Sequence, residues 1–422
     1  MALSPHALRE VPFMGVIFVV AEAVKRGFYN GHPDWSNLGQ GQPEVGVMEG
    51  APARIASVEI RPEDHAYGPL EGTAELRSAV AADYNRRFRV GKKSQYGPEN
   101  VAIAQGGRLC LTRAMAALDD VTVGYQLPDY TAYEDMFNTH LARLHPHPVM
   151  TREADGFRLT PASFEAAVVE ADLAAFLVSN PCNPTGNTIE GDELAELMAV
   201  AKSRGVTLFL DEFYSHFIYT PVDGDARPGP GPVSGAAFVD DVNEDPVLIF
   251  DGLTKNHRYP GWRIGWVVGP SQMVEAMART ASAIDGGPSR IAQRAALAAL
   301  EPARADQETQ AVRAVFCQKR NLMVRRLKDM GIRFAAEPSS TFYCWACLDG
   351  LPAPFNDAME FFWRALELKV MTVPGAFFDV NPGKRRSGPS PYAQWMRFSF
   401  GPDMANMVQG LDRLEAMIAA AR

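Results

Sequence analysis

Short, continuously apolar runs separated by helical stretches dominate the middle of the chain. The runs predict buried strands at 101–104, 121–124, 174–178, 206–210, 247–250 and 264–268. Between and before these strands, apolar positions at helical spacing predict helices at 74–88, 108–118 and 190–204. Continuously apolar strands that alternate with helices are typical of an α/β fold, in which helices cover both faces of a mostly parallel sheet.

The pattern changes near residue 300, which indicates a second, smaller α+β domain. A long helix at 304–329 leads into strand-like runs at 331–335, 341–348 and 396–400 and helices at 356–367 and 403–421. A further helix is expected at 14–26, and the Pro- and Gly-rich segments 221–235 and 381–391 are expected to be surface loops. We therefore expect an N-terminal segment, 1–45, that joins the small domain, a large domain, 46–303, and a small C-terminal domain, 304–422.

Composition narrows the classes of function. Apolar residues make up 47% of the chain and charged residues 22%, which is ordinary for a globular protein. The net charge of −9 argues against nucleic acid or an anionic membrane as the main partner. Five cysteines, an odd number, favour reduced thiols and a cytoplasmic location, and the apolar run 16–20 lacks the features of a signal peptide.

The sequence does not favour a metal site. Cys344 and Cys347 form a Cys-x-x-Cys pair inside a strand-like run, without the second ligand pair that zinc requires. The histidines at 140, 145 and 147 alternate as on a strand, and we interpret them as a solvated strand edge. We therefore expect no metal cofactor.

Polar clusters follow four of the predicted strands, where open α/β sheets bind their ligands. They are 105–108, 179–186, 211–214 and the loop that contains Lys255. Lysine forms Schiff bases with aldehydes, and an arginine such as Arg263, further along that loop, holds phosphate through several donors. An aldehyde cofactor that carries a phosphate needs both residue types, which points to pyridoxal 5'-phosphate (PLP).

Many short motifs occur in the order and spacing of one family. They include Gly41-Gln42-Pro43, Tyr67-Gly68-Pro69-Leu70-Glu71-Gly72, Pro128-Asp129-Tyr130, Asn180-Pro181-Cys182-Asn183-Pro184-Thr185-Gly186, Asp211 to Tyr214, Lys255 to Arg263, Val373-Pro374-Gly375 and Arg397-Phe398-Ser399. Over roughly residues 35 to 420 the chain resembles the class I/II aminotransferases, fold-type-I PLP-dependent enzymes. The resemblance implies a large domain with a seven-stranded sheet, a homodimer with shared active sites, and exchange of an amino group between an L-amino acid and a 2-oxo acid.

The resemblance also implies a role for each residue around the ring of PLP. Lys255 would bind the cofactor as a Schiff base and then act as the base at the substrate Cα. Asp211 would pair with the pyridine nitrogen, and a buried carboxylate there keeps that nitrogen protonated. Asn183 and Tyr214 would hydrogen-bond the phenolic oxygen. Tyr130 would stack on the ring, with Tyr133 as the other candidate.

A second set of implied roles concerns the phosphate. The backbone N–H groups of Gly107 and Arg108 and the guanidinium of Arg263 would bind it. Tyr67 would reach it from the neighbouring subunit. The position three before the lysine usually carries a hydroxyl, but here it is Gly252, while Thr254 directly precedes Lys255. We expect this glycine to loosen the phosphate site or to leave room for another group.

The substrate end of the implied site is less determined. Arg397 would bind the α-carboxylate, Asn183 would help to position it, and Gly41 would let the N-terminal segment close over it. Arg108 would bind a distal carboxylate of an acidic substrate, or else be a solvated residue at a helix start. Aromatic substrates are the competing expectation, with Phe13, Phe18, Tyr29 and Trp35 as candidate lining residues.

Two other functions stay open at this point. On the same fold, PLP also serves lyases, cyclases and oxidative deaminases of specialised amino acids. Gly252, Arg108 and the segment 221–235 are the features that keep this alternative open. A non-catalytic cofactor sensor fused to a DNA-binding domain is disfavoured by the acidic chain and by the short segment before residue 35. Arg258, also in the Lys255 loop, has no implied role and is expected to be structural.

Overall fold

A computed structural model describes residues 15–222 and 225–420. Its α-helices are α1 Gly15–Val24, α2 Ala74–Phe88, α3 Gly107–Ala117, α4 Ala132–Asn138, α5 Pro161–Ala171, α6 Gly191–Arg204, α7 Ser271–Ile284, α8 Arg290–Ala299, α9 Pro302–Asp329, α10 Ala358–Glu367 and α11 Met404–Ala419. Its strands are β1 Ser36–Asn37, β2 Val101–Ala104, β3 Val121–Leu127, β4 Leu144–Met150, β5 Ala175–Ser179, β6 Thr207–Asp211, β7 Tyr219–Val222, β8 Asp225–Pro228, β9 Val247–Gly252, β10 Gly265–Val268, β11 Tyr343–Cys347, β12 Val370–Met371, β13 Val373–Pro374 and β14 Trp395–Ser399.

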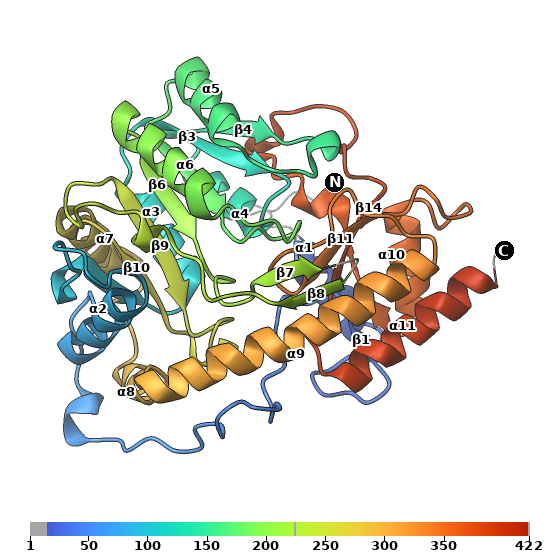
Figure 1. Cartoon of the computed structure of the whole chain (residues 1–422), viewed down its shortest axis with the longest axis horizontal. Coiled ribbons are helices and arrows are strands. Elements are labelled where there is room, and N and C mark those ends of the chain that lie inside the picture. Colours follow the sequence, from blue (N-terminus) through green and yellow to red (C-terminus); the bar gives the residue numbers. More distant parts are fainter. Residues whose placement is uncertain (1–14, 223–224, 421–422) are drawn as a thin grey trace, which may run out of the picture.

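A seven-stranded sheet forms the centre of the larger lobe, as the apolar runs predict. Its strand order is β2-β10-β9-β6-β5-β3-β4, and β10 alone runs antiparallel to both of its neighbours. Every residue of β2, β5, β9 and β10 is buried, because helices cover both faces of the sheet (Figure 1). The predicted α/β class with a mostly parallel sheet is confirmed.

The register of the parallel strands brings their carboxyl ends to one level. Ser179, at the end of β5, pairs with Asp211, at the end of β6, and Asp211 pairs with Phe250 near the end of β9. The chain leaving each strand therefore begins at the same edge of the sheet. This edge carries the segments in which the sequence places its polar clusters.

A second lobe contains the three-stranded antiparallel sheet β11-β14-β13. The helix α9 runs from the side of the large sheet towards α10 and α11 of this lobe (Figure 1). The short parallel pair β1–β12 joins the N-terminal part of the chain to the same lobe, with Ser36 opposite Val370. The division into domains at residues 45 and 303 stays a prediction. Within the described residues, no helix is both long enough and apolar enough to cross a membrane.

Two sequence predictions about this architecture are wrong. The segment 221–235 is not entirely loop, because β7 and β8 pair with each other and Asn321 of α9 donates to the carbonyl of Ala226 at 2.7 Å. The run 331–335 does not form a strand, because Arg333 makes only an isolated bridge with Cys347. In both cases the deciding partner is distant in sequence, so the local pattern does not reveal it.

Several elements were not anticipated from the pattern, namely α4, α5, α7, α8 and β4. The strand β4 contains the alternating His145 and His147 and lies at the edge of the sheet. Exposed His145 contacts Asp120 at 2.7 Å, which fits the interpretation of a solvated strand edge. Cys344 and Cys347 are free, buried thiols in β11.

Candidate active site

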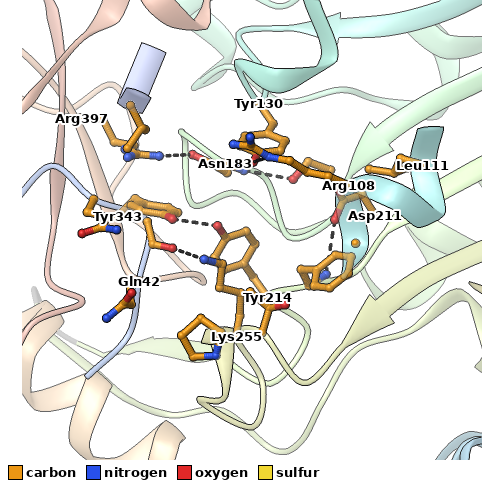
Figure 2. A pocket seen from close by; sticks show the side chains of 18 of the residues that line it. Gln42, Arg108, Leu111, Tyr130, Asn183, Asp211, Tyr214, Lys255, Tyr343 and Arg397 are labelled. Atoms are coloured by element: carbon orange, nitrogen blue, oxygen red, sulfur yellow. Dashed lines mark hydrogen bonds between the residues drawn. The ribbon is translucent and has the colours of Figure 1, made fainter. Parts of the chain in front are cut away.

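A pocket of about 310 Å³ opens where the carboxyl ends of the large-sheet strands face the second lobe. Its volume lies at the lower end of the range typical of small-molecule sites, roughly 300 to 1,000 Å³. Eleven of the twelve site residues predicted from the sequence line it: Gly41, Gly107, Arg108, Tyr130, Asn183, Asp211, Tyr214, Thr254, Lys255, Arg263 and Arg397. Figure 2 shows how several of these side chains converge from separate elements.

Lys255 lies in the loop after β9, and its ammonium group donates to the carbonyl of Gly41 (Figure 2). Burial lowers the pKa of Lys255 to about 7, and the positive charges of Arg397, Arg108 and Arg263 act in the same direction. A neutral amine is therefore accessible near neutral pH. Such an amine is a competent nucleophile and base.

Asp211 ends β6 and is held by Tyr133, which the sequence suggested only as the second candidate for stacking on the ring. The Tyr133 hydroxyl donates to Asp211 Oδ2 at 2.7 Å, and Tyr133 itself is fully buried. Burial raises the pKa of Asp211 to about 6, while the hydrogen bonds from Tyr133 and from the Phe213 N–H oppose that rise. Asp211 is thus a buried carboxylate prepared to accept a cationic or N–H partner.

Arg397, on β14, is the buried cation that enters from the second lobe. It donates to Asn183 Oδ1 at 2.8 Å and to the carbonyl of Gly39 at 2.6 Å. These bonds use two of its five N–H groups, so three remain for a ligand. Within the described chain, Arg397 Nε is buried without a hydrogen-bond partner. The guanidinium is therefore oriented for a further acceptor such as a carboxylate.

Tyr343, on the neighbouring strand β11, connects two of the predicted residues. Its ring lies 4.1 Å from the Arg397 guanidinium carbon, and its hydroxyl is 2.7 Å from the Tyr214 hydroxyl (Figure 2). The sequence contained no direct signal for this role, because the pairing of β11 with β14 is not encoded locally. Burial raises the pKa of Tyr343 to about 12, so both phenols remain protonated at neutral pH.

Glycines at the start of α3 create the phosphate-sized end of the pocket. A Cβ on Gly106, whose φ is +88°, would lie 2.2 Å from Nη2 of Arg263. A Cβ on Gly265 would lie 2.8 Å from the backbone N of Gly107. The guanidinium of Arg263 can therefore lie directly against the start of α3, where the N–H groups of Leu109 and Cys110 donate to Gly106 but those of Gly107 and Arg108 have no acceptor within the helix. The two together form an anion-binding corner.

The expectation that Gly252 leaves free room is wrong. A Cβ at this position would lie 2.5 Å from the carbonyl oxygen of Ile264 and 3.1 Å from the ring of Phe213. The same ring is 2.2 Å from where a Cβ of Gly107 would stand. Phe213 and the antiparallel strand β10 thus fill the space that a hydroxyl side chain at 252 would occupy. The hydroxyl of Thr254 is buried and has no partner among the described residues.

The lining of the pocket also includes one further cation and several apolar side chains. Arg108 Nε donates to the Tyr130 hydroxyl at 3.0 Å, which fixes the guanidinium at the wall (Figure 2). Val16 and Ile17 of α1 and Leu111 of α3 supply the apolar side chains. Arg108 therefore lines the pocket while its side chain remains exposed to solvent at the start of α3, so both expectations for this residue stand.

The aromatic residues proposed for this wall lie elsewhere. Phe18 packs against Phe362 and Phe377, because the opposite face of α1 rests on the second lobe. Trp35 is buried against Phe28, and Tyr29 is 60% exposed. Phe13 lies outside the described residues. The sequence identified the correct segment but the wrong face of the helix.

Tyr67 is the one predicted site residue that does not line the pocket. Its side chain is 98% exposed in a segment without regular structure. The expectation that it acts on a neighbouring subunit is consistent with this placement but untested by it.

Comparisons with known proteins agree with the fold and the geometry. The family model described as "Aminotransferase class I and II" matches residues 33–414. An aspartate aminotransferase of Streptomyces avermitilis is 28% identical over 397 residues, which cover 91% of this chain and 89% of that protein. An LL-diaminopimelate aminotransferase of Desulforudis audaxviator is 29% identical and covers 91% of each chain.

Solved structures show the same fold at lower identity. An aminotransferase from Mycobacterium tuberculosis superposes with a TM-score of 0.77 at 24% identity, covering 99% of this chain and 100% of that one. Aspartate aminotransferase from Thermus thermophilus gives a TM-score of 0.76 at 23% identity, covering 97% and 100%.

Proposed function

Because this chain belongs to the aminotransferase class I and II family, we propose that it is a PLP-dependent enzyme that moves an amino group between an L-amino acid and a 2-oxo acid. The observation that carries the proposal is the meeting of Lys255, Asp211 and Arg397 in one buried pocket. A reactive amine, a buried carboxylate and a guanidinium with unused N–H groups line the same pocket. Amino-acid chemistry on an aldehyde cofactor requires these three groups.

The residues present fit PLP. Lys255 would hold it covalently, Asp211 would face its ring nitrogen, and the first turn of α3 with Arg263 would bind its phosphate. The glycine corner at 106 and 265, in which a side chain would collide, supports the phosphate position. When bound, PLP supplies an electrophilic carbon and an aromatic ring that accepts electrons.

The chain's own groups then perform binding and proton transfer. Arg397 binds the α-carboxylate through the N–H groups that Asn183 and Gly39 leave free, which fixes the orientation of the substrate Cα. Lys255, with a pKa near neutrality, moves the proton at that Cα. Asp211 would face the ring nitrogen and favour its protonated form, and the Tyr214 hydroxyl would donate to the phenolic oxygen of the cofactor.

For the substrate, the favoured class is an amino acid with an acidic side chain. Arg108 is bonded to Tyr130 and lines the pocket, and no acidic side chain other than Asp211 lines it in the described chain. Three of the pocket's side chains are arginines, which disfavours a cationic substrate. The recurrence of aspartate in the names of relatives is in keeping with this.

Replacement of Arg108 by leucine separates acidic from apolar substrates. We expect KM for aspartate or glutamate to rise at least tenfold, because a charge-assisted hydrogen bond contributes about 1.5–3 kcal/mol. KM for an apolar amino acid should stay within about twofold. An unchanged preference would instead favour the apolar wall of Val16, Ile17 and Leu111 as the determinant of specificity.

The lyase, cyclase or deaminase alternative loses part of its support. The space at Gly252 is filled, and the hairpin β7–β8 rests on α9 rather than lining the pocket. Lys255→Ala tests the function itself, and loss of all turnover is expected. Retained turnover in that variant would remove the proposal.

We also propose a homodimer with shared active sites. The segment 45–67 exposes Val47 at 94%, Ile60 at 53% and Tyr67 at 98%, which is costly for a segment without a covering partner. Sedimentation velocity should give twice the monomer mass. A monomer of full activity would contradict the proposal.

A further inference from the structure

A short segment, residues 39–46, crosses the mouth of the pocket and offers carbonyl groups to two of its cations. We call it the strap. The carbonyl of Gly39 accepts from Arg397 at 2.6 Å, and the carbonyl of Gly41 accepts from Lys255. The strap has no helix or strand of its own. Its position must therefore be fixed by contacts with other elements.

One edge of the strap is bound to the second lobe. The N–H of Glu44 donates to the carbonyl of Gly401 at 2.7 Å, and the Glu44 carboxylate accepts from Lys319 of α9 at 2.5 Å. Gly401 is packed so closely that a Cβ there would lie 2.3 Å from the carbonyl oxygen of Gln42. These contacts hold the strap on the side that faces away from Lys255.

The other edge is bound by Arg258, three residues after Lys255 in the same loop. Its Nη1 donates to the carbonyls of Glu44 at 2.9 Å and Gly46 at 3.1 Å. Its Nε donates to Glu308 Oε1 of α9 at 2.5 Å. The Arg258 side chain is fully buried. One guanidinium thus joins the lysine loop, the strap and α9.

The backbone at Arg258 shows that this arrangement is not the local preference of the chain. Its φ is +55°, in the left-handed region where glycine or asparagine is favoured. A long cationic side chain at such a position is retained only where its contacts outweigh the conformational cost. Arg54, which lies over the ring of Tyr259 at 3.5 Å and donates to the Arg258 carbonyl at 2.6 Å, helps to fix this backbone.

We propose that Arg258 is a positioning residue that sets the strap across the pocket, so that the carbonyl groups of Gly39 and Gly41 orient Arg397 and Lys255. This inference rests on the proposed function, because Arg397 and Lys255 are the groups that bind and transform the substrate there. The hydrogen bonds of the Arg258 side chain reach Glu44, Gly46 and Glu308, none of which lines the pocket. Only its backbone N–H contacts a lining residue, the carbonyl of Lys255 at 3.0 Å, so the effect of the guanidinium passes through the strap.

The consequence for catalysis is specific. When the Arg258 guanidinium is absent, the strap retains its contacts with the second lobe and with Lys255 but loses those at Glu44 and Gly46. The Gly39 carbonyl, one of the two acceptors of Arg397, is then held less firmly, and Asn183 alone orients the guanidinium. Carboxylate binding should therefore suffer more than the chemical step, because small displacements of binding groups reduce orientation.

The test compares Arg258→Ala and Arg258→Gly with Arg89→Ala in the holoenzyme. Arg89 is a matched control, since it is fully buried and also binds backbone carbonyls, those of Ser94, Ala236 and Val239, far from the strap. For both Arg258 variants, we expect KM for amino acid and 2-oxo acid to rise at least tenfold while kcat changes less than threefold. Millimolar guanidinium should partly restore KM in Arg258→Gly, where the backbone strain is also relieved.

A second readout does not depend on activity. Hydrogen–deuterium exchange of the apo-protein should be at least tenfold faster for peptides that cover 39–46 in both Arg258 variants, and unchanged there in Arg89→Ala. The proposal is overturned if the strap of the Arg258 variants exchanges at the same rate as in the wild-type protein. It is also overturned if KM rises no more in these variants than in Arg89→Ala. Faster exchange in a protein without transamination would instead contradict the proposed function and leave the positioning role standing.

Discussion

Tyr133→Phe should shift the ionisation of Asp211 to higher pH. The substitution removes only the hydroxyl that donates to Asp211 Oδ2 at 2.7 Å and keeps the buried ring. A hydrogen bond to a charged group contributes about 1.5–3 kcal/mol, and one pKa unit corresponds to about 1.4 kcal/mol. The carboxylate of Asp211, whose pKa burial already raises to about 6, should therefore ionise roughly one to two units higher.

The measurable result is a change in how the apo-protein binds PLP. At pH 7 about nine tenths of wild-type Asp211 is ionised, whereas in the variant the fraction falls to between roughly one half and one tenth. The affinity for PLP at pH 7 should then fall about two- to tenfold and approach the wild-type value above pH 9. Fluorescence titrations of the apo-protein with PLP between pH 7 and pH 9 measure this affinity directly.

Tyr125→Phe is the control, because the Tyr125 hydroxyl is also buried but donates to the carbonyl of Val380, away from the pocket. It should lower the melting temperature without moving the pH dependence of PLP binding. If Tyr133→Phe and wild type give parallel pH profiles, the hydrogen bond to Asp211 does not tune its ionisation, and the reasoning is refuted.

Substitutions at three further positions test other parts of the account. Tyr343→Phe keeps the ring beside Arg397 and should lower kcat about fivefold, because the bond to the Tyr214 hydroxyl is lost. Tyr343→Leu also removes the ring beside Arg397 and should raise KM as well. Equal effects of the two substitutions on KM would contradict this prediction. Burial raises the pKa of Glu212 from an ordinary 4.5 to about 8, so its contribution to stability is complete below pH 4.5 and is lost as the pH rises through 8. The melting temperature of Glu212→Gln should therefore fall less between pH 5 and 8.5 than that of the wild type. The same dependence of melting temperature on pH in both proteins would contradict this prediction. Gly252→Ser should destabilise the protein by about 1–3 kcal/mol rather than tighten PLP binding, because the serine side chain would meet the backbone at the start of β10. A variant that is more stable and binds PLP more tightly would disprove the packing argument.

The sequence predicts the large sheet and most of the pocket for the same physical reason. Strands buried on both faces are continuously apolar, so the strand that ends at Asp211 and the strand that precedes Lys255 are recognisable in the sequence. Because these strands are parallel, the residues that follow them lie at one edge of the sheet. All of the predicted site residues except Tyr67 line one pocket in the structure. The resemblance to a family adds the roles, which remain proposals.

The parts that the sequence did not predict depend on contacts between distant segments. Tyr133 was the second candidate for stacking on the ring, and its bond to Asp211 follows only from the packing of α4 against the sheet. Tyr343 acquires its position from the pairing of β11 with β14, and Arg258 from a strap more than two hundred residues earlier. Phe18 was one candidate for the pocket lining, because helical periodicity identifies two faces but not which one the second lobe covers.

The most direct test of the central claim is a single turnover of the holo-protein with an L-amino acid and no 2-oxo acid acceptor. Cofactor absorbance and mass spectrometry of the substrate should report the same event. We expect the aldehyde form of the cofactor to disappear as its amino form accumulates, together with one equivalent of the corresponding 2-oxo acid, fastest for aspartate or glutamate. A cofactor that returns unchanged while the amino acid is altered would contradict transamination and assign the pocket to another PLP-dependent reaction.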